Sequence, residues 1–429
     1  MFLTTFSVRA DKEHYFTKGV INALIRFYYN KTDQFILSSV IRDSAEEAYV
    51  ETITFDSVPY VILHIPNSSQ DGIEQSLTKL FHDIAPDIIH SQMIEGYDVA
   101  AAKTCGIPIV LTIHIGGIIC PRGGGNGLRN YNDQICNTHV GEECKKCLLQ
   151  DLPAPFIAKL ASKILPTSIK AFIRSQKKQV LYLSPLANID KRIDVVESRI
   201  ELLKYAHIIA ANYRLAEVLR RNGLSEKVHI IPHGVVRRKR IPLPMLSAGN
   251  PVKFFMLGRI QYSKAVHEVF RAFDGIPKSK YELHIIGDAE TSRKEQRYYN
   301  KVRRLARNKN IIFHGRLDNT QIDSVIAKCH IMIQATICME VYGIAIAESL
   351  SIGRPVLATK CGGAEMQIKD GYNGWLIKPH DIAELRQSII KIINSPEVIK
   401  KYASNAELPM PIDNYVTNLN NLYHQIAYD

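Results

Sequence analysis

Short apolar runs alternate with stretches of helical periodicity along the whole chain. In the first half, four runs have the pattern of buried strands: "QFILSSVI", "VPYVILHI", "DIIHSQM" and "PIVLTIHI". In the second half, five runs have it: "VKFFMLGRI", "YELHIIGDA", "NIIFHGRL", "HIMIQAT" and "RPVLATK". Between them, apolar positions recur at helical spacing in segments such as "DGIEQSLTKLFHDIA" and "YGIAIAESLSIG". This alternation predicts an α/β protein with parallel sheets covered by helices.

Two such series predict two Rossmann-like, doubly wound domains. The boundary between them is expected at residues 235–251, a basic and then proline-rich segment that ends in Gly-Asn-Pro and suits a linker. The expected organisation is a first domain over residues 1–240, a second over 241–405, and a terminal helix over 406–429 that packs back on the first domain. Because ligands bind at the carboxyl ends of parallel strands, two facing domains predict a site in an interdomain cleft.

Composition and charge narrow the choice of partners. The 429 residues are 46% hydrophobic and 22% charged, and 54 Lys and Arg against 42 Asp and Glu give a net charge of +12. Such an excess suits nucleotide phosphates, nucleic acid or an anionic membrane surface. No run reaches the roughly 18 apolar residues of a membrane span, and the N-terminus lacks the pattern of a signal peptide. The expected location is cytoplasmic, with peripheral contact at the inner face of the membrane.

Two glutamates flank a predicted helix start in the stretch "CMEVYGIAIAESLSIGRPV". Glu340 precedes Gly343, and Glu348 lies inside the apolar run that follows. A helix start with a glycine offers free backbone N–H groups to a phosphate, and the two carboxylates could accept hydrogen bonds from sugar and ribose hydroxyls. The alternative is an acidic residue favoured by the helix dipole and a solvated glutamate.

Cations follow the first strand of the predicted second domain. Arg259 comes directly after that strand and Lys264 five residues later, an arrangement suited to a diphosphate. The alternative is two solvated cations beside a helix start. Further glycine turns follow at 287–288, 362–363 and 370–374.

In this order and spacing, the motifs resemble those of the family 4 retaining glycosyltransferases, which have the GT-B fold. The resemblance covers nearly all of the second domain, the link at residues 206–235 that leads into it, and the first domain more loosely. The matching positions are Gly258, Arg259, Lys264, Gly287, Asp288, Glu340, Gly343, Glu348, Gly353, Pro355, Val356, Gly362, Gly363, Asp370, Gly371, Asn373 and Gly374.

The resemblance implies that a nucleotide-diphosphate sugar binds mainly to the second domain. Arg259 and Lys264 would hold the diphosphate and stabilise the charge that grows on it as it leaves. Glu348 would bind the ribose and Glu340 the hydroxyls of the donor sugar. The backbone amides of Tyr342, Gly343 and Ile344 would complete the phosphate cradle.

The reaction chemistry is also implied by the resemblance. The acceptor would attack the front face of the sugar, the leaving phosphate would help to deprotonate it, and the anomeric configuration would be retained. The two glutamates are therefore not assigned as the acid and base of a hydrolase. No cofactor is expected for catalysis, and the chain has no Asp-x-Asp metal motif.

In the first domain, the resemblance assigns His114, after the strand "PIVLTIHI", to the donor sugar near its reacting carbon; the alternative is a structural histidine. His90 is expected to line the same cleft. The chain departs from the family pattern where the first strand ends, because the usual Gly-Gly loop is missing and only Lys18 and Gly19 are candidates there. Two further departures are Ala265 in place of a glycine, and a shortened "GGAEM" that leaves the role of Glu365 open.

Two segments suggest additional contacts. Four cysteines within residues 120–147 could close a tetrahedral, structural zinc site that orders a glycine-rich loop, and the alternatives are free thiols or disulfides. Residues 156–178 combine apolar and basic side chains and could lie on anionic lipid, the alternative being a solvated charged face. The four cysteines are Cys120, Cys136, Cys144 and Cys147.

The sequence thus predicts a hexosyltransferase that moves a sugar from a UDP- or GDP-linked donor to a saccharide or lipid-linked acceptor, in the biosynthesis of cell-surface polysaccharide or glycolipid. The alternatives are a GT-B nucleotide-sugar epimerase and a non-catalytic nucleotide-sugar binding protein. Nucleic acid is not an expected partner, because the combined set of cations and glutamates predicts a sugar pocket. A dinucleotide dehydrogenase is disfavoured because no G-x-G-x-x-G follows the first strand.

Overall fold

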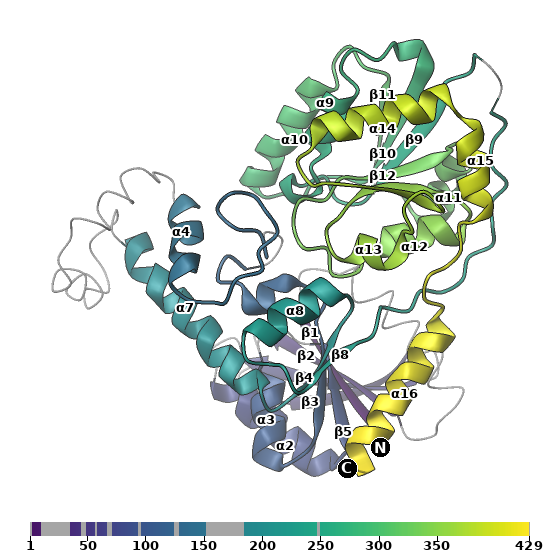
Figure 1. The fold of residues 1–429 in the computed structure, drawn as a ribbon. Helices are drawn as coiled ribbons and strands as arrows, with labels where there is room; N and C mark the ends of the chain where they lie inside the picture. The colour runs from purple at the N-terminus through teal and green to yellow at the C-terminus, as the bar shows by residue number, and fades with distance from the viewer. Residues whose placement is uncertain are drawn as a thin grey trace. The chain divides into compact units, whose positions relative to one another are not determined.

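The chain forms two compact units in a computed structural model (Figure 1). The first contains residues Met1–Asn132, Cys136–Ile231 and Val416–Asp429, and the second contains Asp133–Ile135 and Pro232–Tyr415. The structure describes residues 2–9, 35–43, 49–55, 58–66, 71–92, 96–123, 128–151, 184–246 and 249–428.

The first unit is built on an eight-stranded sheet with the strand order β3-β4-β2-β1-β5-β6-β7-β8. Every neighbouring pair is parallel except β3 and β4, which are antiparallel. The strands are β1 (Phe2–Arg9), β2 (Phe35–Asp43), β3 (Tyr49–Phe55), β4 (Val58–Pro66), β5 (Ile88–Ser91), β6 (Ile109–Thr112), β7 (His207–Ala210) and β8 (Val228–Ile230).

From β4 onward, helices connect successive strands, as the alternation of the sequence predicts. Strands β5 and β6 are buried along their whole length, which is the state expected of a parallel strand covered on both faces. The helices are α2 (Asp71–Ile84), α3 (Tyr97–Cys105), α4 (Glu142–Gln150), α7 (Ser184–Leu203) and α8 (Tyr213–Arg221), with the short η1 (Gly116–Ile119).

One helix, α16 (Ile412–Tyr428), is shared between the units. Residues up to Tyr415 cluster with the second unit, and Val416 onward cluster with the first. Val416, Leu419 and Tyr423 are buried on one side of this helix, at the i, i+3, i+7 spacing of an amphipathic helix. The last turns of the chain therefore supply part of the core of the first unit.

The second unit is built on a six-stranded, wholly parallel sheet with the order β11-β10-β9-β12-β13-β14. The strands are β9 (Val252–Leu257), β10 (Tyr281–Ile286), β11 (Ile311–Gly315), β12 (Ile331–Gln334), β13 (Val356–Thr359) and β14 (Gly374–Ile377).

Successive residues of β9 bury opposite faces of this sheet. Phe254 packs in a core formed with α9, α10 and α14, whereas Phe255 packs in a second core formed with α11, α12 and α13. Figure 1 shows these two groups of helices on either side of the strands. The helices are α9 (Val266–Ala272), α10 (Arg293–Leu305), α11 (Asn319–Ile326), α12 (Ile344–Ser351), α13 (Gly363–Gln367), α14 (Ile382–Asn394) and α15 (Glu397–Ser404), with the short η3 (Tyr262–Lys264) and η4 (Lys278–Lys280).

Arg354, inside the Gly-Arg-Pro motif, is fully buried in the second unit. Its guanidinium donates hydrogen bonds to the carbonyl oxygens of Cys329 at 2.8 Å, Ile241 at 2.7 Å and Pro242 at 2.9 Å. Burial lowers the pKa of this group to about 10, so it remains a cation at neutral pH. The Arg354 side chain therefore ties Ile241 and Pro242, at the predicted start of the second domain, to the segment between α11 and β12.

The predicted fold class is confirmed, with one difference and some gaps. The antiparallel β3 was not predicted, although its segment "YVETITF" alternates polar and apolar residues, and it forms a hairpin with β4. Lys18, Gly19 and the basic segment 156–178 lie outside the described residues. In the part of the chain that the structure does describe, no helix is both long and apolar enough to cross a bilayer.

Candidate functional site

Two backbone turns meet where β9 and β10 end in the second unit. Gly258 and Gly287 have φ angles of 137° and 132°, a region that favours glycine. A Cβ atom on Gly287 would lie 2.1 Å from the carbonyl oxygen of Gly258. Gly287 therefore has to be glycine for the two turns to pack backbone against backbone, whereas at Gly258, where a Cβ atom would meet open space, only the φ angle favours glycine.

Lys264 is presented by the short helix η3, which follows β9. The next residue, Ala265, is buried and adopts the left-handed conformation, with φ 46° and ψ 37°, before α9 begins. Only glycine adopts this conformation without a steric penalty, which gives a physical reason for glycine at this position in the family pattern. The loop is held in place by a hydrogen bond from the Ile337 amide to the Ser263 carbonyl, at 2.9 Å.

Lys264 and Glu340 form an ion pair at the carboxyl ends of β9 and β12, which are neighbours in the sheet. The side chains are largely buried, 24% and 11% exposed respectively. The same carboxylate oxygen also accepts hydrogen bonds from Gln334 Nε2 at 3.2 Å and Thr336 Oγ1 at 3.4 Å. Three donors from two adjacent strand ends thus fix the position of this carboxylate.

The charge of Lys264 is stabilised by this arrangement. Burial alone would lower the pKa of the ammonium, but the charge of Glu340 and its hydrogen bond more than offset that effect, and the pKa is raised. The pair therefore places a fixed cation beside an oriented carboxylate.

The loop that carries Glu340 is clamped against α13. The Glu340 amide donates to the Cys361 carbonyl, and the Gly363 amide donates to the Glu340 carbonyl, both at 2.8 Å. A Cβ atom on Gly363 would lie 2.1 Å from the Tyr342 carbonyl oxygen. Glu365 closes the same turn by accepting from the Gly362 amide at 2.9 Å, so its role in this structure is to cap α13.

Helix α12 begins directly after this loop. Gly343, with φ 83°, is its N-cap residue, and no side chain caps the first turn. The first backbone N–H groups of the helix, near Ile344, therefore have no side-chain cap. Together with the positive end of the helix dipole, they form an arrangement suited to an anion. Tyr342 is buried, and its hydroxyl has no hydrogen-bond partner in the part of the chain that is described.

Glu348 lies one turn further along α12 and is only partly exposed. Burial raises the pKa of its carboxyl, while the nearby charge of Arg238 opposes that rise. Arg238 itself pairs with Asp323 of α11. Within the described residues no hydrogen bond to the Glu348 carboxylate is present, so its side-chain oxygens are available to hydroxyl groups.

Arg259 takes a different partner from Lys264. Its guanidinium donates to Glu290 at 2.5 Å, and the side chains are half exposed. The structure therefore brings Lys264 and Glu340 together and pairs Arg259 with a carboxylate in the loop after the Gly-Asp turn.

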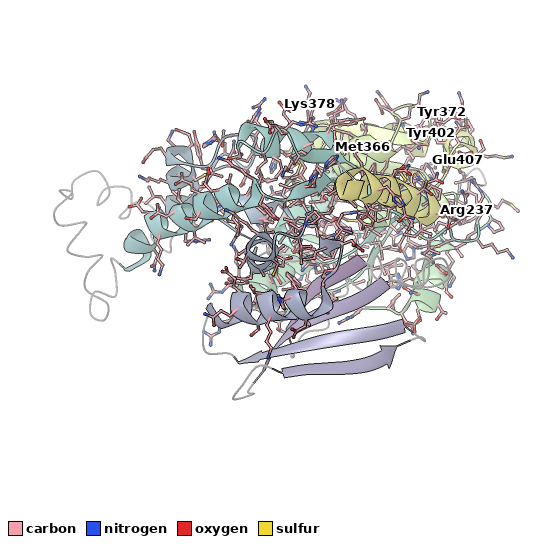
Figure 2. All side chains as sticks on the ribbon, turned by 90° about the horizontal axis from the view of Figure 1, so that it is seen from below. Arg237, Met366, Tyr372, Lys378, Tyr402 and Glu407 are labelled. Atoms are coloured by element: carbon pink, nitrogen blue, oxygen red, sulfur yellow. The ribbon has the colours of Figure 1, made fainter. Side chains whose placement is uncertain are left out.

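The "DGYNG" motif has a structural role. Asp370 accepts from the Leu376 amide and Asn373 from the Lys369 amide, both at 2.9 Å, which closes the turn before β14. Asn405 donates to the Tyr372 carbonyl at 3.0 Å, so the turn packs against the end of α15. Figure 2 labels Tyr372 of this turn and Tyr402 of α15.

In the first unit, His114 belongs to a hydrogen-bonded chain of side chains. His114 Nε2 contacts Gln92 Oε1, and Gln92 Nε2 lies 3.1 Å from His90 Nε2. His90 also contacts Thr112 at 2.6 Å and the hydroxyl of Tyr423 from α16.

Both histidines are neutral at physiological pH. Burial lowers the pKa of His90 to about 3, with a further contribution from His114, and burial lowers the pKa of His114 to about 4. His90 is 3% exposed and has partners on both ring nitrogens, so it acts as an internal connector in this unit. His114 is the more exposed of the two.

The four cysteines of the insertion are close neighbours. Their thiols influence one another electrostatically, and burial raises the pKa of Cys120, of Cys144 to about 11, and of Cys147. Cys144 and Cys147 share one face of α4. All of them are free thiols, and among the described residues no three His, Cys, Asp or Glu side chains have the placement of a metal site.

Sequence reasoning missed several members of these clusters. Gln334 and Thr336 stand at the end of the strand "HIMIQAT", where a polar residue after a buried strand is a usable signal. Arg238 and Tyr423 come from segments distant in sequence, and nothing in their local pattern indicates these contacts.

Similarity to solved structures agrees with the two α/β units described above. The crystal structure of Anabaena Alr3699/HepE in complex with UDP and glucose has a TM-score of 0.64, with 16% identity over 99% of both chains. The lipopolysaccharide outer core galactosyltransferase WaaB in its apo form has a TM-score of 0.63, with 15% identity over 99% of both chains. The fold of the chain is therefore GT-B.

The match to a protein-family model lies within the second unit. Residues 239–408 match the protein-family model described as glycosyl transferases group 1. The uncharacterized glycosyltransferase MJ1069 of Methanocaldococcus jannaschii is 26% identical over 164 residues, 37% of this chain and 40% of that protein. The poly(glycerol-phosphate) alpha-glucosyltransferase of Bacillus subtilis is 24% identical over 265 residues, 59% of this chain and 36% of that protein. The chain thus spans less than half the length of these curated relatives.

Proposed function

We propose that the chain is a retaining glycosyltransferase of family 4 that uses a nucleotide-diphosphate sugar. The observation that carries this proposal is the Lys264–Glu340 pair, held by Gln334 and Thr336 at the ends of two adjacent parallel strands. All four residues lie inside the segment that matches the group 1 glycosyltransferase model. The structure of Alr3699/HepE with UDP and glucose supports a UDP-linked donor, and a GDP-linked donor is the alternative.

In this proposal the cations and backbone amides of the second unit bind the diphosphate. Lys264, Arg259 and the start of α12 stabilise the negative charge that develops as the bond between the anomeric carbon and the diphosphate oxygen breaks. The acceptor oxygen bonds to the same face of the sugar, and its proton passes to the departing phosphate. Preorganised charge at the leaving group then supplies most of the rate acceleration.

The carboxylates orient the donor. Glu340, whose position is fixed by three donors, binds hydroxyls of the sugar, and Glu348 binds the ribose with its free acceptor oxygens. His114 is proposed to contact the donor sugar as a neutral imidazole, since burial keeps its pKa near 4. The proposed acceptor is a saccharide or a lipid-linked saccharide.

A panel of UDP- and GDP-sugars with sugar acceptors tests this function. Release of nucleoside diphosphate together with a glycosylated product is expected for one donor, and NMR of the product should show the donor's anomeric configuration. An epimerised sugar formed without acceptor would instead indicate an epimerase, and saturable binding without turnover would indicate a binding protein.

The variants Lys264→Ala and Glu340→Ala test the site. Each should lower kcat/KM by at least 100-fold, the scale of losing one preorganised contact to developing charge, with an unchanged circular dichroism spectrum. Lys309→Ala is the matched control, because Lys309 pairs with Asp274 elsewhere in the second unit. Wild-type turnover in either site variant would contradict the assignment.

We also propose that Cys120, Cys136, Cys144 and Cys147 bind a structural zinc ion. Their mutual proximity supports this, although the thiols would have to rearrange, since they do not have the placement of a metal site in this structure. Zinc would be tetrahedral and would have no part in catalysis. Elemental analysis of purified protein should give one zinc per chain, and Cys144→Ser/Cys147→Ser should abolish it; a metal-free wild type would contradict the proposal.

A further inference from the structure

A basic groove lies on the second unit, and neither Lys264 nor Glu340 lines it. It has a volume of about 600 Å³ and lies between the last turn of α10 and the first half of β11. Its rim carries Arg303, Arg304 and Arg307 with Asn300, and its apolar wall includes Ile311 and Phe313. β11 is the edge strand of the sheet and runs parallel to β10 and β9. The groove is therefore near the amino ends of the strands, whereas Lys264 and Glu340 are at the carboxyl ends.

The Phe313 ring, which forms the floor of the groove, packs against the core of the second unit. The Arg303 guanidinium lies over the Phe313 ring, 4.3 Å from its centroid, which is a cation–π contact. The same ring contacts Phe270 of the buried core edge-on, with centroids 6.0 Å apart, and Tyr299 of α10 at 6.3 Å. A cation is thus held over an aromatic surface that is anchored in the hydrophobic core.

The three arginines are exposed, and no carboxylate in the described part of the chain pairs with Arg303, Arg304 or Arg307. Residues 293–309 contain eight Lys and Arg against a single acidic residue, Glu295 at the opposite end of the helix. A favourable interaction with the helix dipole explains one or two cations in a last turn. It does not explain a concave site with an aromatic floor.

We propose that this groove binds the phosphodiester headgroup of an anionic phospholipid and so holds the second unit at a membrane surface. Guanidinium groups match phosphate oxygens through paired hydrogen bonds. The apolar floor provides a surface for the glycerol and the first carbons of the chains, which a small inorganic anion would not need. The proposal rests on these residues alone and holds whatever reaction the chain catalyses.

Sedimentation of the full chain with vesicles tests the proposal. Binding to vesicles of phosphatidylglycerol and phosphatidylcholine is expected, with little binding to phosphatidylcholine alone. Arg303→Gln/Arg304→Gln/Arg307→Gln should weaken binding on the order of 100-fold, given the contribution of each cation next to an anionic surface. The matched control is Arg293→Gln/Lys294→Gln/Arg297→Gln, which removes the same charge from the exposed start of α10 and should weaken binding less than about threefold.

Several results would overturn the proposal. Equal losses in the two triple variants would show attraction by net charge only, and no loss in the groove variant would place the binding elsewhere. Thermal stabilisation by glycerol phosphate or inorganic phosphate, removed by the groove variant and without vesicle binding, would show a site for a small soluble anion. Binding to a single-stranded oligonucleotide in preference to vesicles would show a nucleic-acid surface.

Discussion

Single residues set the geometry of the candidate site, and Ala265 is the most informative of them. It is a buried alanine in the left-handed conformation between Lys264 and α9. A Cβ atom in this conformation costs about 1–2 kcal/mol, and the flexibility of glycine in the unfolded chain returns only part of that cost. The strain is therefore located directly beside a residue proposed to contact substrate.

Ala265→Gly should raise the free energy of unfolding by about 0.5–1 kcal/mol. Chemical denaturation measures it, and Ala216→Gly in the interior of α8 is the control, since glycine inside a helix destabilises by about 1 kcal/mol. Equal destabilisation in both variants would mean that the left-handed conformation at Ala265 carries no strain.

His90 should make the protein less stable in acid. Its folded pKa is about 3, below the value near 6.5 of an unfolded histidine, so the unfolded chain binds the proton first. Stability is therefore full above about pH 6.5 and decreases as the pH falls toward the folded pKa. The loss attributable to His90 between pH 7.5 and pH 5 is about 2 kcal/mol.

Urea unfolding at several pH values measures this effect. His90→Leu should flatten the pH dependence relative to the wild type, even if the variant is less stable at every pH. The same slope in both proteins would mean that His90 is not neutral and buried as described. Among single residues, Lys264 and Glu340 were predicted from the sequence, but Gln334 and Gln92 were not. The role of an amide side chain depends on its hydrogen-bond partners, and these are known only once the fold is known.

Among the elements, the loop from Glu340 to Gly343 packs directly against the start of α13. Their contact is backbone against backbone at Gly363, where a side chain has no room. Gly-Gly motifs are often read as flexible turns, but here the second glycine permits close packing. The position of the Glu340 carboxylate depends on that contact.

Gly363→Ala should therefore displace the Glu340 loop. The expected result is a loss of 2 kcal/mol or more, about the scale of overpacking in a core, and a decrease of donor affinity. Gly275→Ala is the control: it has a positive φ of 82° but open space around it, so only about 1 kcal/mol of backbone strain is expected. A Gly363→Ala protein with wild-type stability and affinity would contradict the packing described.

Most elements of the second unit were predictable from sequence, because wholly buried parallel strands form continuous apolar runs. The strands β9 to β13 fall on the predicted runs. β14 was not predicted, since its four residues "GWLI" follow a turn and are too short to show a period. The antiparallel β3 was also missed, although the alternation of polar and apolar residues in "YVETITF" is a usable strand signal.

At the scale of the whole molecule, the proposed function predicts that a ligand stabilises one unit selectively. A nucleoside diphosphate at 100 times its Kd should stabilise the second unit by about 2.7 kcal/mol. Hydrogen exchange should show slower exchange at the ends of β9 and β12, with β5 and β6 less affected. Lys264→Ala should abolish the effect, and Lys309→Ala should not; protection that persists in Lys264→Ala would place the nucleotide elsewhere.

The sequence indicated only in part which residues belong to each unit. Asp133–Ile135 cluster with the second unit although the chain on either side of them belongs to the first. No local pattern indicates such a contact, because it depends on where a long insertion runs in space. The +12 charge suggested anionic partners in general, whereas the three-arginine groove became visible only once α10 and β11 were placed together.

Helix α16 has a consequence for how the protein is made. Val416, Leu419 and Tyr423 fill part of the interior of the first unit, and Tyr423 contacts His90. A ribosome delivers these residues only after the entire second unit has been synthesised. Domains usually fold in the order in which they emerge. The first unit, however, cannot complete its core until α16 has been synthesised, and until then it leaves an apolar face exposed. Nascent chains arrested before residue 416 should therefore be chaperone clients, and the emergence of α16 should be the step that completes the first unit.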